Sequence, residues 1–140
     1  MAIVFQSDIK SFKLSKKTKL KLFIKHILTV EGYGVGNINF RFCDDPEILE
    51  VNRSFLYHDY YTDVITFPLG GTSNKIDADI IISIDTVLSN SVIQKVSFIQ
   101  ELHRVIFHAL LHLCGFGDKT GKEKKLIREK EEEYLESYFG

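Results

Sequence analysis

The sequence predicts a protein of the α/β type, an α+β fold in which a small mixed β-sheet of about four strands is covered by about five helices. Three observations lead to this prediction. A chain of 140 residues with 44% hydrophobic content fits a single core. Short stretches rich in alternating or β-branched residues are typical of strands, and longer stretches with apolar residues three and four apart are typical of helices. No repeat or linker divides these stretches, so residues 1–140 are expected to form a single domain.

The first half of the chain is expected to alternate strands with helices. Residues 3–7 (IVFQS) predict a short strand, and residues 15–32 predict an amphipathic helix. Residues 37–44 (NINFRFCD) alternate apolar and polar side chains, which is typical of a half-buried strand. Asp45 before Pro46 indicates the start of a second helix, because proline is favoured in the first helical turn.

The second half is expected to contain two strands and then three helices. Residues 62–69 (TDVITFPL) are rich in β-branched and aromatic side chains, and residues 77–84 (DADIIISI) are the most apolar strand candidate and therefore a central one. Helices are predicted near residues 86–94, 97–114 and 122–138. The order β-α-β-α-β-β-α-α-α favours a mixed sheet with helices on both faces.

Composition favours a cytoplasmic protein. The apolar patch at residues 1–5 is too short for a secretory signal, and no stretch approaches the ~20 apolar residues of a membrane helix. The two cysteines, Cys43 and Cys114, fit a reducing compartment better than a disulfide framework. A net charge of −1 gives no overall attraction to nucleic acid, although seven lysines without an acid lie between residues 9 and 30. Those lysines form either a basic surface or the solvated face of a helix.

The strongest candidate for a functional site is HALLHLCGFGDK, residues 108–119. A helix advances about 100° per residue, so His108 and His112 lie on one face, one turn apart, where two imidazoles can bind one ion. Gly115 follows where the helix is expected to end, because glycine readily takes the left-handed conformation. The chain can then bring Asp118 back over the same face. Two nitrogens and one carboxylate oxygen leave a position open for water, which is typical of catalytic zinc.

These residues also allow other interpretations. Each histidine could be a hydrogen-bonded core residue, although this spacing, followed in register by glycine and aspartate, is hard to obtain by chance. Two histidines and a carboxylate also suit ferrous iron. A metalloprotease with the HExxH motif is disfavoured, because Ala109 follows His108 where such enzymes have glutamate. Cys114 and His103 are rotated away from the predicted ligands around the helix, so neither is expected to bind the ion.

The chain resembles the YbeY family of bacterial endoribonucleases, which act in ribosomal RNA maturation. The family signature H-G-x-L-H-L-x-G-Y-D-H corresponds to HALLHLCGFGD at residues 108–118. A second family segment, N-x-x-F/Y-R-x-x-D-x-P-T-D-V-L-S-F-P, corresponds to NRSFLYHDYYTDVITFP at residues 52–68. The family's G-D-I strand is matched by ADI, with Asp79 at its centre, and its acidic residue seven before the first histidine by Glu101.

Several positions depart from the family pattern, among them Phe116 and Gly117 just before the third ligand. The third family ligand, a histidine, falls on Asp118, which can also ligate zinc. The family arginine in the second segment falls on Leu56, which removes a guanidinium expected to hold phosphate. Ala109 replaces a glycine and should strengthen the helix, and Tyr61 replaces a proline of the family loop.

The resemblance implies a zinc-dependent, single-strand-specific endoribonuclease with His108, His112 and Asp118 as metal ligands. It would act at the 3′ end of 16S ribosomal RNA and in ribosome quality control, with ribosomal RNA and ribosomal subunit proteins as partners. Two alternatives stay open: a ribosome-associated factor in which the metal is only structural, and a metal-dependent hydrolase of another bond. The sequence does not indicate the oligomeric state.

Glu101 and Arg104 are candidates for roles around the ion. Glu101 lies two turns before His108, where it could act as the general base or orient a ligand imidazole. The alternative is a solvent-facing acid. Arg104 could replace the positive charge missing at Leu56, or it could be a surface arginine paired with Glu101 or Glu132.

Three further residues complete the predicted site. Asp63 and Thr66 lie in the matched TDVITF segment and are expected to line the cleft, with turn capping and strand packing as the alternatives. Asp79 is a candidate for binding substrate or for supporting the ligands, on the strength of the resemblance.

Overall fold

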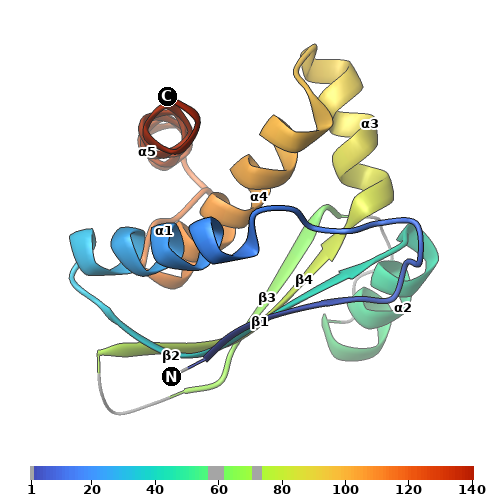
Figure 1. Ribbon diagram of the computed structural model, residues 1–140, viewed down its shortest axis with the longest axis horizontal. Coiled ribbons are helices and arrows are strands. Elements are labelled where there is room, and N and C mark those ends of the chain that lie inside the picture. The colour runs from blue at the N-terminus through green and yellow to red at the C-terminus, as the bar shows by residue number, and fades with distance from the viewer. Residues whose placement is uncertain (1, 57–61, 71–73) are drawn as a thin grey trace.

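The structure is a computed structural model that describes residues 2–56, 62–70 and 74–140, with the backbone alone described at residues 55 and 56. The elements are β1 (Ala2–Ser7), α1 (Lys17–Val30), β2 (Gly34–Cys43), α2 (Asp45–Leu56), β3 (Val64–Pro68), β4 (Lys75–Ser83), α3 (Ile84–Gln94), α4 (Phe98–Leu113) and α5 (Gly121–Phe139). Their order and the α+β class are as predicted (Figure 1). Within the described part of the chain, no helix is long and apolar enough to span a membrane.

The apolar strand β4 lies inside the sheet, as the sequence predicts. The strand order is β1-β2-β4-β3. β1, β2 and β4 are parallel, and β3 is antiparallel to β4. Ile80 of β4 stands beside Phe40 of β2 on one side and Thr66 of β3 on the other. A strand with neighbours on both sides, and a helix layer over it, favours such continuous apolar runs.

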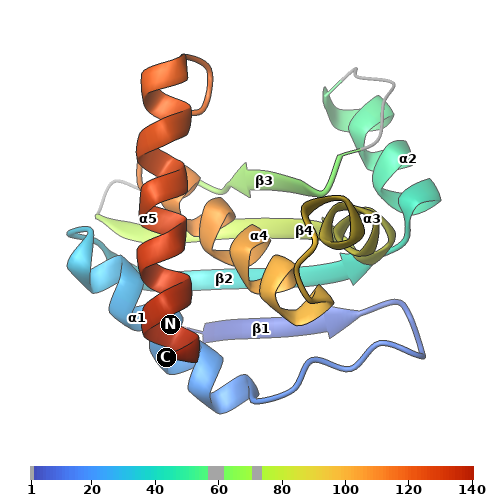
Figure 2. The same ribbon diagram turned by 90° about the horizontal axis from the view of Figure 1, so that it is seen from above.

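Helices lie on both faces of the sheet, but unequally. α1 and α4 pack against one face around Phe40 and Ile80, and α5 crosses over α4 as an outer layer (Figure 2). On the other face α2 covers only one end, where Ile48 packs with Ile81. The rest of that face carries polar side chains such as Asn39. One face of the sheet therefore supports the main core, and the other is largely open.

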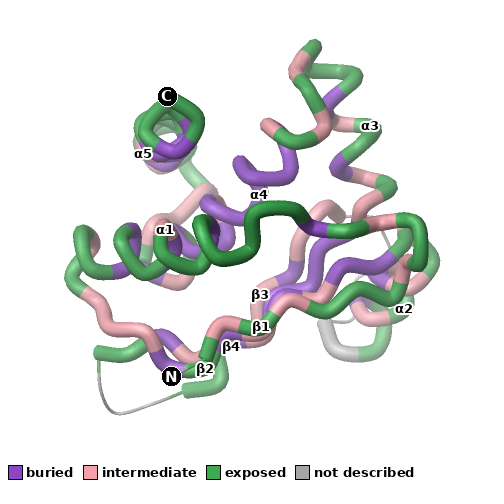
Figure 3. The backbone as a smooth tube through the Cα atoms, in the orientation of Figure 1, coloured by how far each residue is buried: buried purple, intermediate pink, exposed green. Residues whose placement is uncertain are grey.

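Helix α4 is buried along most of its length because it lies between the sheet and α5 (Figure 3). The Ser97 side chain caps its first turn by accepting a hydrogen bond from the Gln100 N–H. Polar side chains on such a helix lose contact with water, so each one needs a partner inside the protein. The buried environment of α4 makes its charged residues the natural place to look for a site.

The end of α4 is a Schellman turn at the predicted position. Gly115 has a φ of +99°, its N–H donates to the His112 carbonyl, and the Phe116 N–H donates to the Leu111 carbonyl. A capping box at Thr120 then starts α5 only a few residues later. The short connection turns the chain back over the end of α4, as the metal-site prediction requires.

Candidate active site

The two predicted histidine ligands present matching nitrogens to one cavity. The rings of His108 and His112 have centroids 6.4 Å apart and planes within 5° of parallel. The His108 Nδ1–H donates to Glu131 Oε2 at 2.7 Å, and the His112 Nδ1–H donates to the Phe116 carbonyl at 3.1 Å. These bonds fix the tautomer that leaves each Nε2 with its lone pair. The Schellman turn that ends α4 thus also orients a candidate ligand.

Asp118 is the third member of this group. Its Oδ2 lies 3.8 Å from His108 Nε2, and Asp118 lines a cavity of about 130 Å³ together with Thr66, His108 and His112. Two ligands on one tetrahedral zinc ion stand about 3.3 Å apart. Among the described residues no three His, Cys, Asp or Glu side chains are already close enough together to hold an ion. The donor types, two imidazole nitrogens and one carboxylate oxygen, nevertheless fit zinc.

Glu131 is a site residue that the sequence reasoning missed. It lies on α5 and is 3% exposed, with one oxygen on His108 and the other 3.3 Å from Arg104 Nη1. A buried carboxylate bonded to the Nδ1 of a ligand imidazole is a common arrangement at zinc sites. The sequence did carry a signal, because Glu131 falls at helical spacing between Ile127 and Leu135, both of which are buried.

Arg104 and Glu101 are both buried. The alternative interpretations had placed Arg104 on the surface and Glu101 in contact with solvent. Arg104 is 5% exposed and Glu101 2%. The expected ion pairs of Arg104 are present, with Glu132 at 2.6 Å and Glu101 at 3.6 Å. Burial raises the pKa of Glu101, although the Arg104 charge acts in the opposite direction. The bond to the His108 imidazole that Glu101 was predicted to make is made by Glu131 instead.

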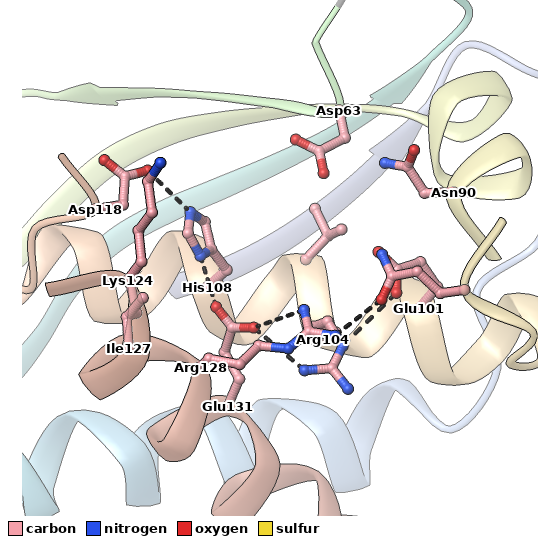
Figure 4. Close-up of a pocket in the computed structure, with 12 residues that line it drawn as sticks. Asp63, Asn90, Glu101, Arg104, His108, Asp118, Lys124, Ile127, Arg128 and Glu131 are labelled. Carbon is pink, nitrogen blue, oxygen red and sulfur yellow. Dashed lines mark hydrogen bonds and ion pairs between the residues drawn. The ribbon is translucent and has the colours of Figure 1, made fainter. Parts of the chain in front are cut away.

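Asp63 and Thr66 each line a pocket that also includes His108 and Asp118. A cleft of about 290 Å³ is lined by Asp63, Glu101, Arg104, His108 and Asp118. Figure 4 shows the Asp63 carboxyl group pointing into it from the start of β3. Thr66 lines the smaller cavity of about 130 Å³, together with His112. Burial raises the pKa of Asp63, and the nearby His108 partly offsets that rise.

Asp79 is a predicted site residue that lines neither the cleft nor the smaller cavity. Its side chain accepts a hydrogen bond from Asn39 Nδ2 at 3.1 Å. Its neighbours in β4, Ala78 and Ile80, face the main core beneath α4, so Asp79 lies on the opposite face of the sheet. Of the departures from the family pattern, Tyr61 and the side chain of Leu56 lie outside the described residues.

The fold and the cleft define a class of α+β proteins in which two imidazoles of a central helix share a cavity with a carboxylate from the following turn. The family model described as "Endoribonuclease YbeY" matches residues 5–139. This chain belongs to the YbeY family of endoribonucleases, and the resemblance seen in its motifs is confirmed.

Curated relatives and a solved structure agree with this assignment. The Cytophaga hutchinsonii protein named "Endoribonuclease YbeY" is 42% identical over 133 residues, covering 95% of this chain and 93% of the relative. The Parabacteroides distasonis protein of the same name is 42% identical over 135 residues, covering 96% and 94%. A solution structure from Thermotoga maritima, 31% identical, matches with a TM-score of 0.68 over 99% of this chain and 90% of that one.

Proposed function

We propose that this chain is a zinc-dependent, single-strand-specific endoribonuclease that matures the 3′ end of 16S ribosomal RNA and takes part in ribosome quality control. Membership of the YbeY family supports cleavage of RNA. The single observation that carries metal dependence is the pair of imidazoles with both Nδ1 atoms bonded and a carboxylate 3.8 Å from one Nε2. The proposal places the protein in the cytoplasm, with ribosomal RNA and ribosomal subunit proteins as partners.

In this proposal His108, His112 and Asp118 hold the ion. When bound, zinc supplies Lewis-acid activation of water and of a phosphoryl oxygen. Glu131 accepts the Nδ1 proton of His108 in a hydrogen bond and so keeps Nε2 available as a ligand. Arg104 in turn holds Glu131, with a separation of 3.3 Å. The chain thereby fixes the orientation of its ligands before substrate arrives.

Asp63 is the residue we propose to accept a proton during cleavage. Its carboxyl group faces the cleft near His108 (Figure 4). Burial raises its pKa, and a carboxylate with a raised pKa is a stronger proton acceptor. Its oxygen would take the proton of the attacking group, either a water molecule or the RNA 2′-hydroxyl. The alternative base, Glu101, remains a prediction; it lies beside Arg104, further along the cleft.

Variants at position 118 test metal dependence directly. Elemental analysis of the purified protein should find about one zinc per chain. Asp118→Ala should lower both zinc content and cleavage of single-stranded RNA, whereas Asp118→His, which restores the family's ligand type, should retain both. Cleavage that persists unchanged in Asp118→Ala would point to a contaminating nuclease and remove support for the proposal.

One departure from the family favours a second candidate function. Leu56 stands where the family has an arginine expected to hold phosphate. A chain without that contact could act as a ribosome-associated factor in which the metal only ties α4 to the turn before α5. High zinc content without cleavage of single-stranded or ribosomal RNA would support this function over the first. Cleavage of another phosphoester, without RNA cleavage, would indicate a hydrolase of a different bond.

A further inference from the structure

Two cations of α5 line the same wall of the cleft. Lys124 and Arg128 are one helical turn apart, and both line the 290 Å³ cleft together with His108 and Asp118. Figure 4 shows their side chains extending from α5 alongside Ile127 and Glu131. Residues four apart on a helix have Cβ atoms about 6 Å from each other. The cleft therefore carries two positive side chains from one helix, with Lys124 extending toward Asp118 and Arg128 toward Glu101 (Figure 4).

These two cations have capacity to bind an anion. Arg128 donates from Nη2 to Gln94 Oε1 at 2.9 Å, and its separations from Glu131 and Glu132 are long, at 3.8 and 3.9 Å. Its side chain is 50% exposed, and a guanidinium has five N–H donors. Lys124 is exposed, and within the described residues no ion pair involves it. Among the described residues Lys124 has no ion-pair partner, and Arg128 keeps N–H donors beyond its hydrogen bond to Gln94 and its two long ion pairs.

Arg104, unlike Lys124 and Arg128, is buried and closely paired with acidic side chains. It is 5% exposed, and its guanidinium is within 3.6 Å of Glu101, Glu131 and Glu132. A phosphate could reach it only by displacing buried carboxylates, which is costly. The sequence suggested Arg104 as the replacement for the family arginine at Leu56, but its charge already serves to hold Glu131.

We propose that Lys124 and Arg128 form a phosphate clamp that holds the backbone of single-stranded RNA across the cleft. This inference rests on the proposed function, because it takes the substrate to be RNA. Arg128 offers a planar fork for one phosphate, and Lys124 offers a point charge. Contacts of this kind position a strand without reading its sequence. The clamp therefore supplies, from α5, the positive charge that Leu56 cannot.

Lys124 gives the cleaner test, because within the described residues it supports no other side chain. Binding of a 2′-O-methyl single-stranded RNA of about 12 nucleotides is measured by fluorescence anisotropy over a range of KCl concentrations. Lys124→Ala should raise the Kd about 5-fold. The slope of log affinity against log salt should become shallower by about 0.7, the value for one lost phosphate contact with a single strand. A variant that only perturbs folding would not change this slope in that way.

Matched variants on the same helix serve as controls. Lys125→Ala removes an exposed lysine that is adjacent in sequence and does not line the cleft, so it should leave Kd and slope unchanged. Lys124→Arg should restore both. In cleavage assays, Arg128→Ala should raise KM with kcat within about 2-fold, because a contact made equally before and during reaction affects binding alone.

Each outcome decides the proposal. A salt slope in Lys124→Ala equal to that of the unmodified protein overturns the clamp, and so does an equal loss in Lys125→Ala, which would indicate diffuse charge. Failure of the unmodified protein to bind the oligonucleotide overturns the clamp as well. Binding with the expected slopes but without cleavage of unmodified RNA supports the clamp and refutes the proposed nuclease activity.

Discussion

His103 and His108 lie five residues apart on the same helix, yet they have opposite surroundings. His103 is 3% exposed, its Nδ1–H donates to the Ile99 carbonyl, and its ring stacks on Tyr138 with centroids 5.0 Å apart. His108 instead donates to the carboxylate of Glu131, and its Nε2 faces the candidate metal cavity. The first is a core residue and the second a candidate ligand.

The pKa values of the two imidazoles move in opposite directions. Burial lowers the pKa of His103. Burial acts in the same sense on His108, but the hydrogen bond and charge of Glu131, with the charges of Asp63 and Asp118, outweigh it and raise the pKa. Nearby carboxylates, more than the degree of burial, therefore separate a candidate metal ligand from a packed imidazole on this helix.

The largest expected effect is the difference in cleavage rate between a variant without the His108 imidazole and one without the His103 imidazole. His108→Ala should slow RNA cleavage about 1000-fold, because a bound metal contributes several kcal/mol to the reaction. His103→Phe should change the rate by less than about 2-fold, since an aromatic ring can keep the stacking on Tyr138. Single-turnover cleavage of a labelled RNA measures both. An equal loss in the two variants would mean that helix integrity, and not ligation, is being tested.

A smaller effect is expected from the carboxylate that distinguishes His108. Glu131→Gln should weaken zinc binding about 10- to 100-fold, because the hydrogen bond to Nδ1 loses its charge. Glu132→Gln is the matched control, since Glu132 also bonds Arg104, at 2.6 Å, whereas the carboxylate that bonds His108 is that of Glu131. Competition with a chelating dye gives both affinities. Similar losses in the two variants would attribute the effect to Arg104.

The smallest effect concerns His103 and pH. Its pKa is lowered in the folded protein, so below about pH 6.5 the unfolded chain takes up the proton more readily. The stability that the neutral ring contributes is thus present above pH 6.5 and lost as the pH falls. The loss is at most about 1.4 kcal/mol per pH unit.

Denaturant unfolding of metal-free protein at pH 7.5 and 5.5 measures this contribution. Other groups titrate in the same range, so the test is the difference between the unmodified protein and His103→Phe. The variant should lose less of its free energy of unfolding on acidification. Identical losses in the two proteins would contradict the assignment of His103 as a neutral core residue.

The strands and helices could be predicted because their signals are local. The apolar run of β4 and the glycine at the end of α4 each act within one element, and both features occur where expected. The same local pattern also placed Asp79, because Asp77 and Asp79 alternate with Ala78 and Ile80. A period of two puts Asp79 on the polar face. The family motif suggested a site role that this alternation does not support.

Parts of the site could not be predicted because they depend on packing between elements. The bond from His108 to Glu131 spans 23 residues and exists only because α5 crosses α4 at this point. The burial of Arg104 has the same origin, since α5 covers the helix face that would otherwise be exposed. The sequence showed only that the acid Glu131 lies among buried apolar positions of α5. It did not show that the partner of Glu131 is His108, on another helix.

Gly117 has a consequence for how this site can vary among related chains. A Cβ at this position would collide with the carboxylate of Glu123, which accepts a hydrogen bond from the Thr120 N–H at 3.0 Å as part of the cap of α5. The neighbouring Asp118 is carried by the same tight turn. A homologue with a larger residue at 117 therefore needs only a shift of the Glu123 carboxylate, because this group is the far end of a flexible side chain.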